Sequence, residues 1–223
     1  MIEVLETIFD WSEVWALLLP LAVLIVFRSK DQHTFLRPVK FYVYMALILN
    51  LAANIIYNQK QLNLNLPWHN NVLIYNAHSL ARLFMFAWFF NSLKQPFLRT
   101  IKKVLPLLFL IFIVINFTMF ESLIGNSISP KIHILEAFLL LFYCLQYYLY
   151  LLKEEQISYK QSPSFWIVTG LGIFVFTNFP VYLFYNPMTS RDVEFAIYIW
   201  KVHKIAHIIF CAFLAKAFYE SRR

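Results

Sequence analysis

The sequence predicts an all-α polytopic membrane protein, a single domain of seven transmembrane helices over residues 1–223. First, 61% of its residues are hydrophobic and only 14% are charged, whereas soluble domains have about 45 to 50% apolar residues. Second, the apolar residues gather in seven segments with short polar connections, leaving no room for a separate soluble domain. Third, Lys and Arg are concentrated in alternate connections.

The first apolar segment, Val14 to Phe27, is the shortest of the seven. Four acidic residues come before it: Glu3, Glu6, Asp10 and Glu13. A cleaved signal peptide instead begins with basic residues. We therefore expect a retained span, extended by Trp11 and Trp15 at the membrane interface.

Six longer apolar segments follow, separated by polar residues. They are Phe41 to Tyr57, Val72 to Leu93, Val104 to Phe120, Ile132 to Leu152, Phe165 to Tyr185 and Phe195 to Phe218. The two cysteines, Cys144 and Cys211, lie inside apolar segments, where a thiol usually packs as a small hydrophobic group. They predict neither a disulfide framework nor a redox pair.

The basic residues predict the orientation. One set of connections carries Arg28, Lys30, Arg37, Lys40, Lys94, Arg99, Lys102, Lys103, Lys153, Lys160, Lys216, Arg222 and Arg223, and the other carries Lys60, Lys131 and Arg191. Because short cytoplasmic loops are the basic ones, the N-terminus is expected outside and the C-terminus in the cytoplasm. The net charge of +7 then reflects topology and contact with the lipid bilayer, with no nucleic acid as partner.

Polar side chains recur inside five of the spans, in the outer half or near the middle. Because such residues are costly in a bilayer, they normally face the bundle interior or a wet cavity. We expect a shared ligand-binding pocket open to the outer side. Its candidate residues are Asn50, Asn54, Tyr75, His78, Arg82, Glu136, Asn178, His203, Lys204 and His207. The alternative is that these residues form hydrogen bonds between helices, worth about 0.6 kcal/mol per pair.

The in-span charges predict the class of ligand. Three cations, Arg82, Lys201 and Lys204, face one anion, Glu136. Such an excess favours a small anionic or lipid-like ligand, bound through Arg82 and Lys204. No catalytic residue is assigned, and no cofactor is expected.

The alternative function is a zinc-dependent intramembrane hydrolase. His203 and His207 are one helical turn apart, so both imidazoles point the same way, and His78 or Glu136 could add a third zinc ligand. This HxxxH spacing resembles the superfamily of the alkaline ceramidases and the progestin and adiponectin receptors. The resemblance implies zinc on His203, His207 and His78. However, the family's third-span Asp is missing, and Asn50 and Asn54 stand where it has a Ser/His arrangement.

A second resemblance covers nearly the whole chain. The stretches "IYNAHSLARLF", "SPSFWIVTGLGIFVFTN" and "IWKVHKIAHIIF" look like an uncharacterised family of short bacterial seven-span proteins. Arg82 replaces that family's third-span Glu, and His207 stands where Asn is usual. The matching residues are Tyr75, Glu136, Ser162, Pro163, Phe165, Trp166, Gly170 and His203.

This family resembles the input modules of sensor kinases. The resemblance implies a sensor in the bacterial inner membrane that acts through a membrane signalling partner or a homo-oligomer. Transport or channel activity, the remaining alternative, needs a polar path through the inner half. Only Tyr143, Gln146 and Tyr147 suggest one there.

Overall fold

The computed structural model describes residues 2–27, 33–59, 62–64, 67, 70–93, 95–121, 128–153, 162–189 and 193–222. This part of the chain is all-α and contains no strand. Its elements are α1 (Ile2–Asp10), α2 (Ser12–Val26), the 3₁₀ turn η1 (Thr34–Leu36), α3 (Arg37–Tyr57), α4 (Val72–Ser92), α5 (Arg99–Met119), α6 (Pro130–Lys153), α7 (Pro163–Thr189) and α8 (Val193–Glu220).

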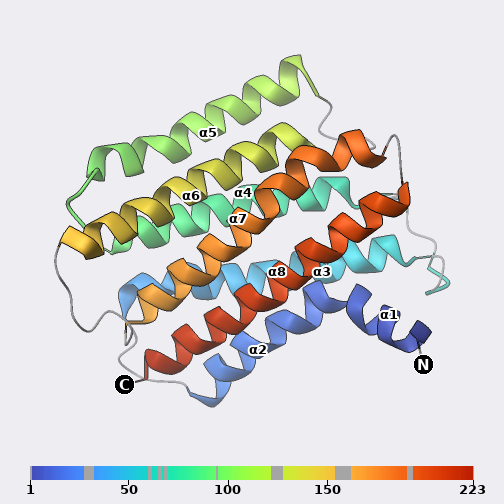
Figure 1. Ribbon diagram of the computed structural model, residues 1–223, viewed down its shortest axis with the longest axis horizontal. Coiled ribbons are helices and arrows are strands. Elements are labelled where there is room, and N and C mark those ends of the chain that lie inside the picture. The colour runs from blue at the N-terminus through green and yellow to red at the C-terminus, as the bar shows by residue number, and fades with distance from the viewer. Residues whose placement is uncertain are drawn as a thin grey trace.

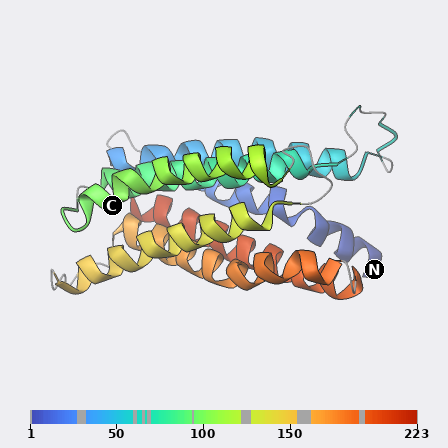
Figure 2. The same ribbon diagram turned by 90° about the horizontal axis from the view of Figure 1, so that it is seen from above.

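Six helices, α3 to α8, are long and apolar enough to cross a membrane. Each overlaps one of the six longer segments that the sequence predicts, so the all-α class is confirmed, and the length and composition of these helices support a multi-pass membrane protein. The helices run alongside one another in a bundle, and the two termini lie at opposite ends of it (Figures 1 and 2). Seven basic residues of the orientation argument lie outside the described residues: Arg28, Lys30, Lys60, Lys94, Lys160, Arg191 and Arg223.

The first predicted span differs most from the expectation. Helix α2 has 15 residues, which at 1.5 Å per residue is about 22 Å, less than the roughly 30 Å of bilayer hydrocarbon. It packs mainly on α8 and α3 and buries Ala16 and Leu17 completely. It begins at Ser12, so Glu13 lies in its first turn and is buried.

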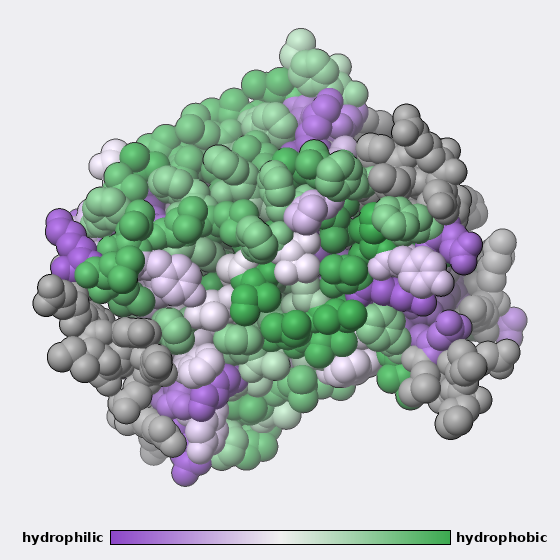
Figure 3. All heavy atoms as spheres, viewed as in Figure 1, coloured by the Kyte–Doolittle hydropathy of each residue, from purple (hydrophilic) through white to green (hydrophobic). Residues whose placement is uncertain are grey.

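The outer surface is apolar. Hydrophobic residues cover most of the face in Figure 3, and hydrophilic residues gather toward its ends. Phe176 on α7 is 73% exposed and Ile48 on α3 is 67% exposed. Soluble monomers rarely expose so much contiguous apolar surface, and such a surface is suited to contact with lipid tails.

The interior combines aromatic packing with one close backbone approach. Tyr42, Phe86 and Phe210 are fully buried, with ring centroids 5.0 to 6.1 Å apart. Helices α7 and α8 share the most extensive contact in the bundle. At Gly170 a side-chain Cβ would overlap the Cβ of Phe213, so glycine permits this approach.

Candidate functional site

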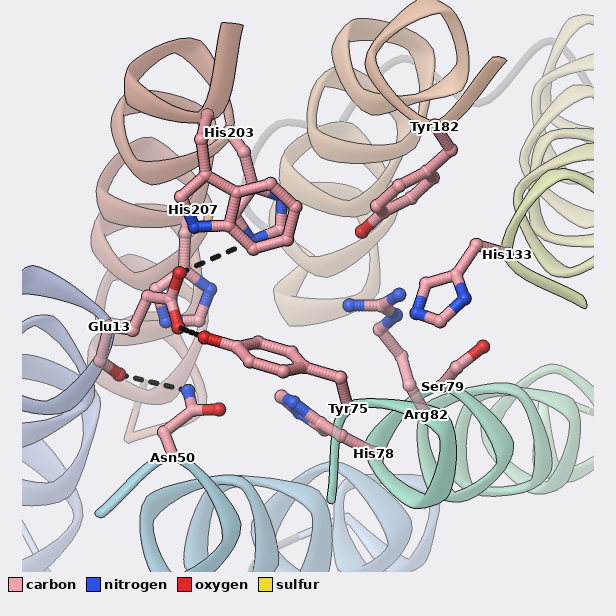
Figure 4. A pocket seen from close by; sticks show the side chains of 11 residues that line it. Glu13, Asn50, Tyr75, His78, Ser79, Arg82, His133, Tyr182, His203 and His207 are labelled. Carbon is pink, nitrogen blue, oxygen red and sulfur yellow. Dashed lines mark hydrogen bonds and ion pairs between the residues drawn. The ribbon is translucent and has the colours of Figure 1, made fainter. Parts of the chain in front are cut away.

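Side chains from six helices line a small pocket in the bundle interior (Figure 4). It lies in the half of the bundle where α2, α4, α6 and α8 begin and α3 and α7 end. Six of the ten predicted site residues line it: Asn50, Tyr75, His78, Arg82, His203 and His207. The other lining residues are Glu13, Ser79, His133, Tyr182 and Trp200.

A buried ion pair forms one wall of the pocket. Arg82 on α4 donates from Nε and Nη2 to the two carboxylate oxygens of Glu136 on α6, at 2.5 and 2.8 Å. Ser79 also donates to Glu136, and the Arg82 guanidinium lies 4.9 Å above the ring of Phe174. Side-chain exposure is 5% for Arg82 and 0% for Glu136, so the two charges are compensated within the protein.

Glu13 connects three helices at the opposite wall (Figure 4). Its Oε2 accepts a hydrogen bond from the Tyr75 hydroxyl at 3.0 Å, and its main-chain carbonyl accepts one from Asn50 Nδ2 at 3.0 Å. Its Oε1 lies 3.6 Å from His203 Nε2 and has no hydrogen-bond partner. Glu13 is only 3% exposed, so a carboxylate oxygen is buried with an unused acceptor site.

His203 is enclosed by polar and aromatic neighbours. Its Nδ1 lies 2.6 Å from the side-chain oxygen of Asn178 on α7. The indole of Trp200 stacks on its imidazole at 4.7 Å between centroids, and Tyr182 lies 6.0 Å away. The position and orientation of this ring are therefore defined from three sides.

Two further histidines, His78 and His133, line the pocket. His78 stacks on Tyr42 at 5.9 Å, and neither His78 Nε2 nor the Tyr42 hydroxyl has a hydrogen-bond partner. Both residues are at least nine-tenths buried. His133 differs, because its Nδ1 is 3.0 Å from the Ser129 carbonyl.

Four predicted site residues do not line the pocket. Asn54 donates to the Asn50 carbonyl, and Asn178 acts through His203. Glu136 lies behind Arg82. Lys204 lies outside the pocket, where its Nζ is 2.7 Å from Asp10 Oδ1.

These positions correct the charge count made from the sequence. Lys204 is paired with Asp10, and Lys201 lies 5.1 Å above the ring of Tyr198. The groups at the pocket are Arg82, Glu136 and Glu13, which sum to a formal −1 when all are ionised and the histidines are neutral. The expected excess of positive charge is therefore not present at the pocket.

The predicted zinc ligands are not assembled around one point. Within the described ranges, no group of three His, Cys, Asp or Glu side chains is placed to hold a metal ion. His203 Nδ1 faces Asn178, and His207 Nε2 lies 3.5 Å from the Cys211 thiol. The side chains as arranged do not fit a three-ligand zinc site.

The pocket is small. About 10 Å³ is open to the centre of a water molecule, which is room for roughly one water. A larger ligand would require the lining side chains to move apart.

Glu13 and Trp200 are the main pocket residues that sequence reasoning missed. Glu13 resembles the other acidic residues before the first span, and only a helix that begins at Ser12 brings it inside the bundle. The signal for Trp200 was its spacing, since it precedes His203 by three residues on the same helical face. No known protein family matches the sequence, and no curated protein or solved structure matches it either.

Proposed function

We propose that the protein is a membrane-embedded ligand-binding module of the sensor type. In this proposal α2 is the first of seven spans, the N-terminus is outside, and the C-terminus is in the cytoplasm of a bacterium. The pocket then opens toward the outer side of the inner membrane. A small polar ligand binds there and changes the contacts that α2, α4 and α8 make with one another.

The observation that supports this proposal is the set of unused polar atoms at the pocket. Glu13 Oε1 and His78 Nε2 line the pocket and are buried without hydrogen-bond partners. Leaving such a group unsatisfied costs about 1 to 3 kcal/mol. Polar residues that only join helices would bond to one another, whereas a binding site keeps donors and acceptors for its ligand.

The packing beyond the pocket favours binding over transport. Tyr42, Phe86 and Phe210 fill the interior next to His78. Each polar residue suggested for an inner path forms a hydrogen bond to another part of the protein. The Tyr143 hydroxyl donates to the Lys102 carbonyl, Gln146 Nε2 donates to the Phe97 carbonyl, and Tyr147 pairs with Ser164.

Signalling requires that the occupied and empty pockets differ in structure. Helix α7 carries Asn178 and also Pro180, whose ring removes a main-chain hydrogen bond and allows the helix to bend. A ligand that moves His203 would act on α7 through Asn178. A membrane partner or a second copy of the chain would receive this movement at the helix surface.

A thermal-unfolding screen tests the proposal. Full-length protein in nanodiscs is mixed with small carboxylates, phosphate, amines and amino acids, and the Tm is measured for wild type and two variants. His78→Phe removes a lining imidazole but keeps a ring against Tyr42. His33→Phe is the matched control, because His33 is exposed and stacks on Phe35 away from the pocket.

We expect one compound class to raise the Tm of wild type and His33→Phe but not that of His78→Phe. If no compound changes the Tm of wild type, and His78→Phe has the same Tm as wild type, the polar residues only join helices. The proposal then fails. Stoichiometric zinc that is lost in His203→Ala or His207→Ala would instead favour the hydrolase.

A further inference from the structure

The hydrogen bonds around His203 determine which of its nitrogens carries a hydrogen. Asn178 Nδ2 donates to the Phe174 carbonyl at 2.7 Å, so Asn178 Oδ1 is the atom that faces His203 Nδ1 at 2.6 Å. An amide oxygen only accepts, so His203 Nδ1 must donate. In the neutral ring, Nε2 then presents a lone pair.

That lone pair points at another acceptor (Figure 4). His203 Nε2 and Glu13 Oε1 are 3.6 Å apart, and Glu13 Oε1 has no hydrogen-bond partner. A direct bond from a charged imidazolium to a carboxylate would be about 2.7 to 2.9 Å long. The separation of 3.6 Å fits two acceptors that have no donor between them, and a ligand would supply that donor.

The charge of the pocket favours a positive donor. Arg82 is already neutralised by two hydrogen bonds to Glu136, and Lys204 is neutralised by Asp10. Among the described residues, no Lys or Arg side chain forms an ion pair with Glu13, whose neighbours are Tyr75, Asn50, Trp200 and His203. One monovalent cation would balance the formal −1 of the pocket.

The size of the pocket and its aromatic lining further restrict the class of cation that it can bind. The space holds a group about as large as one water molecule, and an ammonium ion has nearly that size. Trp200 stacks on His203 and meets Tyr75 edge to face at 5.7 Å, so aromatic rings border the space between Glu13 and His203. Such rings attract ammonium groups.

We propose that the pocket binds a small N–H cation, either ammonium or the ammonium group of a small primary amine, between Glu13 and His203. The cation donates to Glu13 Oε1 and His203 Nε2. This inference rests on the proposed function, because it names the ligand class of the same pocket. It replaces the anionic ligand that the sequence predicts.

Isothermal titration of the full-length protein in nanodiscs tests the inference. The protein is dialysed into ammonium-free buffer and titrated at constant ionic strength with ammonium, methylammonium, tetramethylammonium or sodium chloride. We expect saturable binding of ammonium, methylammonium or both at one site per chain. Sodium and tetramethylammonium, which have no N–H group, should give none. Comparing the affinities for ammonium and methylammonium shows whether the site takes the free ammonium ion or the ammonium group of a primary amine.

Two variants locate the site. Glu13→Gln replaces the carboxylate by an amide of similar size and should weaken ammonium binding at least tenfold. Glu121→Gln is the matched control, because Glu121 pairs with Lys131 and does not line the pocket, and it should bind like wild type. If Glu13→Gln does not fold, the wild-type comparison between ammonium and sodium still decides.

Other outcomes separate this inference from the proposed function. Equal binding of sodium and ammonium, or a Tm that responds to pH but not to ammonium, would overturn the inference. Stabilisation by formate or phosphate alone would overturn it while leaving a ligand-binding pocket. If none of these compounds binds and the wider panel of amines and amino acids also has no effect, both proposals fail.

Discussion

Removing one partner of the Arg82–Glu136 pair should destabilise the protein strongly. Glu136→Gln keeps the side-chain volume but leaves the guanidinium of Arg82, a residue that is 4% exposed, without a counter-charge. It also weakens two charge-assisted hydrogen bonds and the one from Ser79. Breaking a buried pair in this way costs about 3 to 5 kcal/mol.

A double-mutant cycle and a surface control define the expected magnitude. The double variant Arg82→Met with Glu136→Leu removes both charges together. Its loss of unfolding free energy should be much smaller than the summed losses of the two single variants. Glu121→Gln is the matched control, because its pair with Lys131 is 3.5 Å long and the Lys131 side chain is 52% exposed. That change should cost no more than about 1 kcal/mol.

Reversible unfolding by SDS in mixed micelles measures these free energies. Circular dichroism follows the helix content, and all variants are compared in the same micelles. A cost below about 1 kcal/mol for Glu136→Gln, or equal costs for Glu136→Gln and Glu121→Gln, would refute a buried and mutually compensated pair.

Two further predictions concern packing and pH. Gly170→Ala should lower the free energy of unfolding by about 1 to 3 kcal/mol, because the new Cβ overlaps Phe213. Gly172→Ala meets its nearest neighbour at 3.9 Å and should be neutral or stabilising in the same SDS titration; equal losses would contradict the close approach. Desolvation raises the pKa of Glu121, but hydrogen bonds from Ser129 and Asn116 outweigh it and hold that pKa below its usual 4.5. The stabilisation by Glu121 should therefore be complete above about pH 4.5 and shrink below it. It is measured as the free energy of unfolding of wild type minus that of Glu121→Gln. A difference that stays constant down to about pH 3 would contradict this prediction.

The long helices could be predicted from the sequence because their signal is local. Runs of apolar residues bounded by polar connections placed six helices, and the described ends differ from the predicted ones by a few residues. The depth of polar residues along each helix likewise predicted that Tyr75, His78 and His203 share one level. All three line the pocket.

Pairing across helices could not be predicted, because it depends on how each helix is rotated. Lys204 neighbours His203 in sequence, yet it points away from the pocket to Asp10. Glu13 changed the sign of the pocket charge, and its burial depends on where α2 begins. A count of in-span charges cannot detect either effect.

A high-resolution experimental density map of the pocket, from protein prepared in ammonium-containing buffer, would show whether a ligand lies between Glu13 and His203. We expect Glu13 inside the bundle and separate density, the size of one water, within hydrogen-bonding distance of both Glu13 Oε1 and His203 Nε2. A map in which Glu13 faces lipid, or in which Glu13 and His203 bond directly with nothing between them, would contradict this expectation.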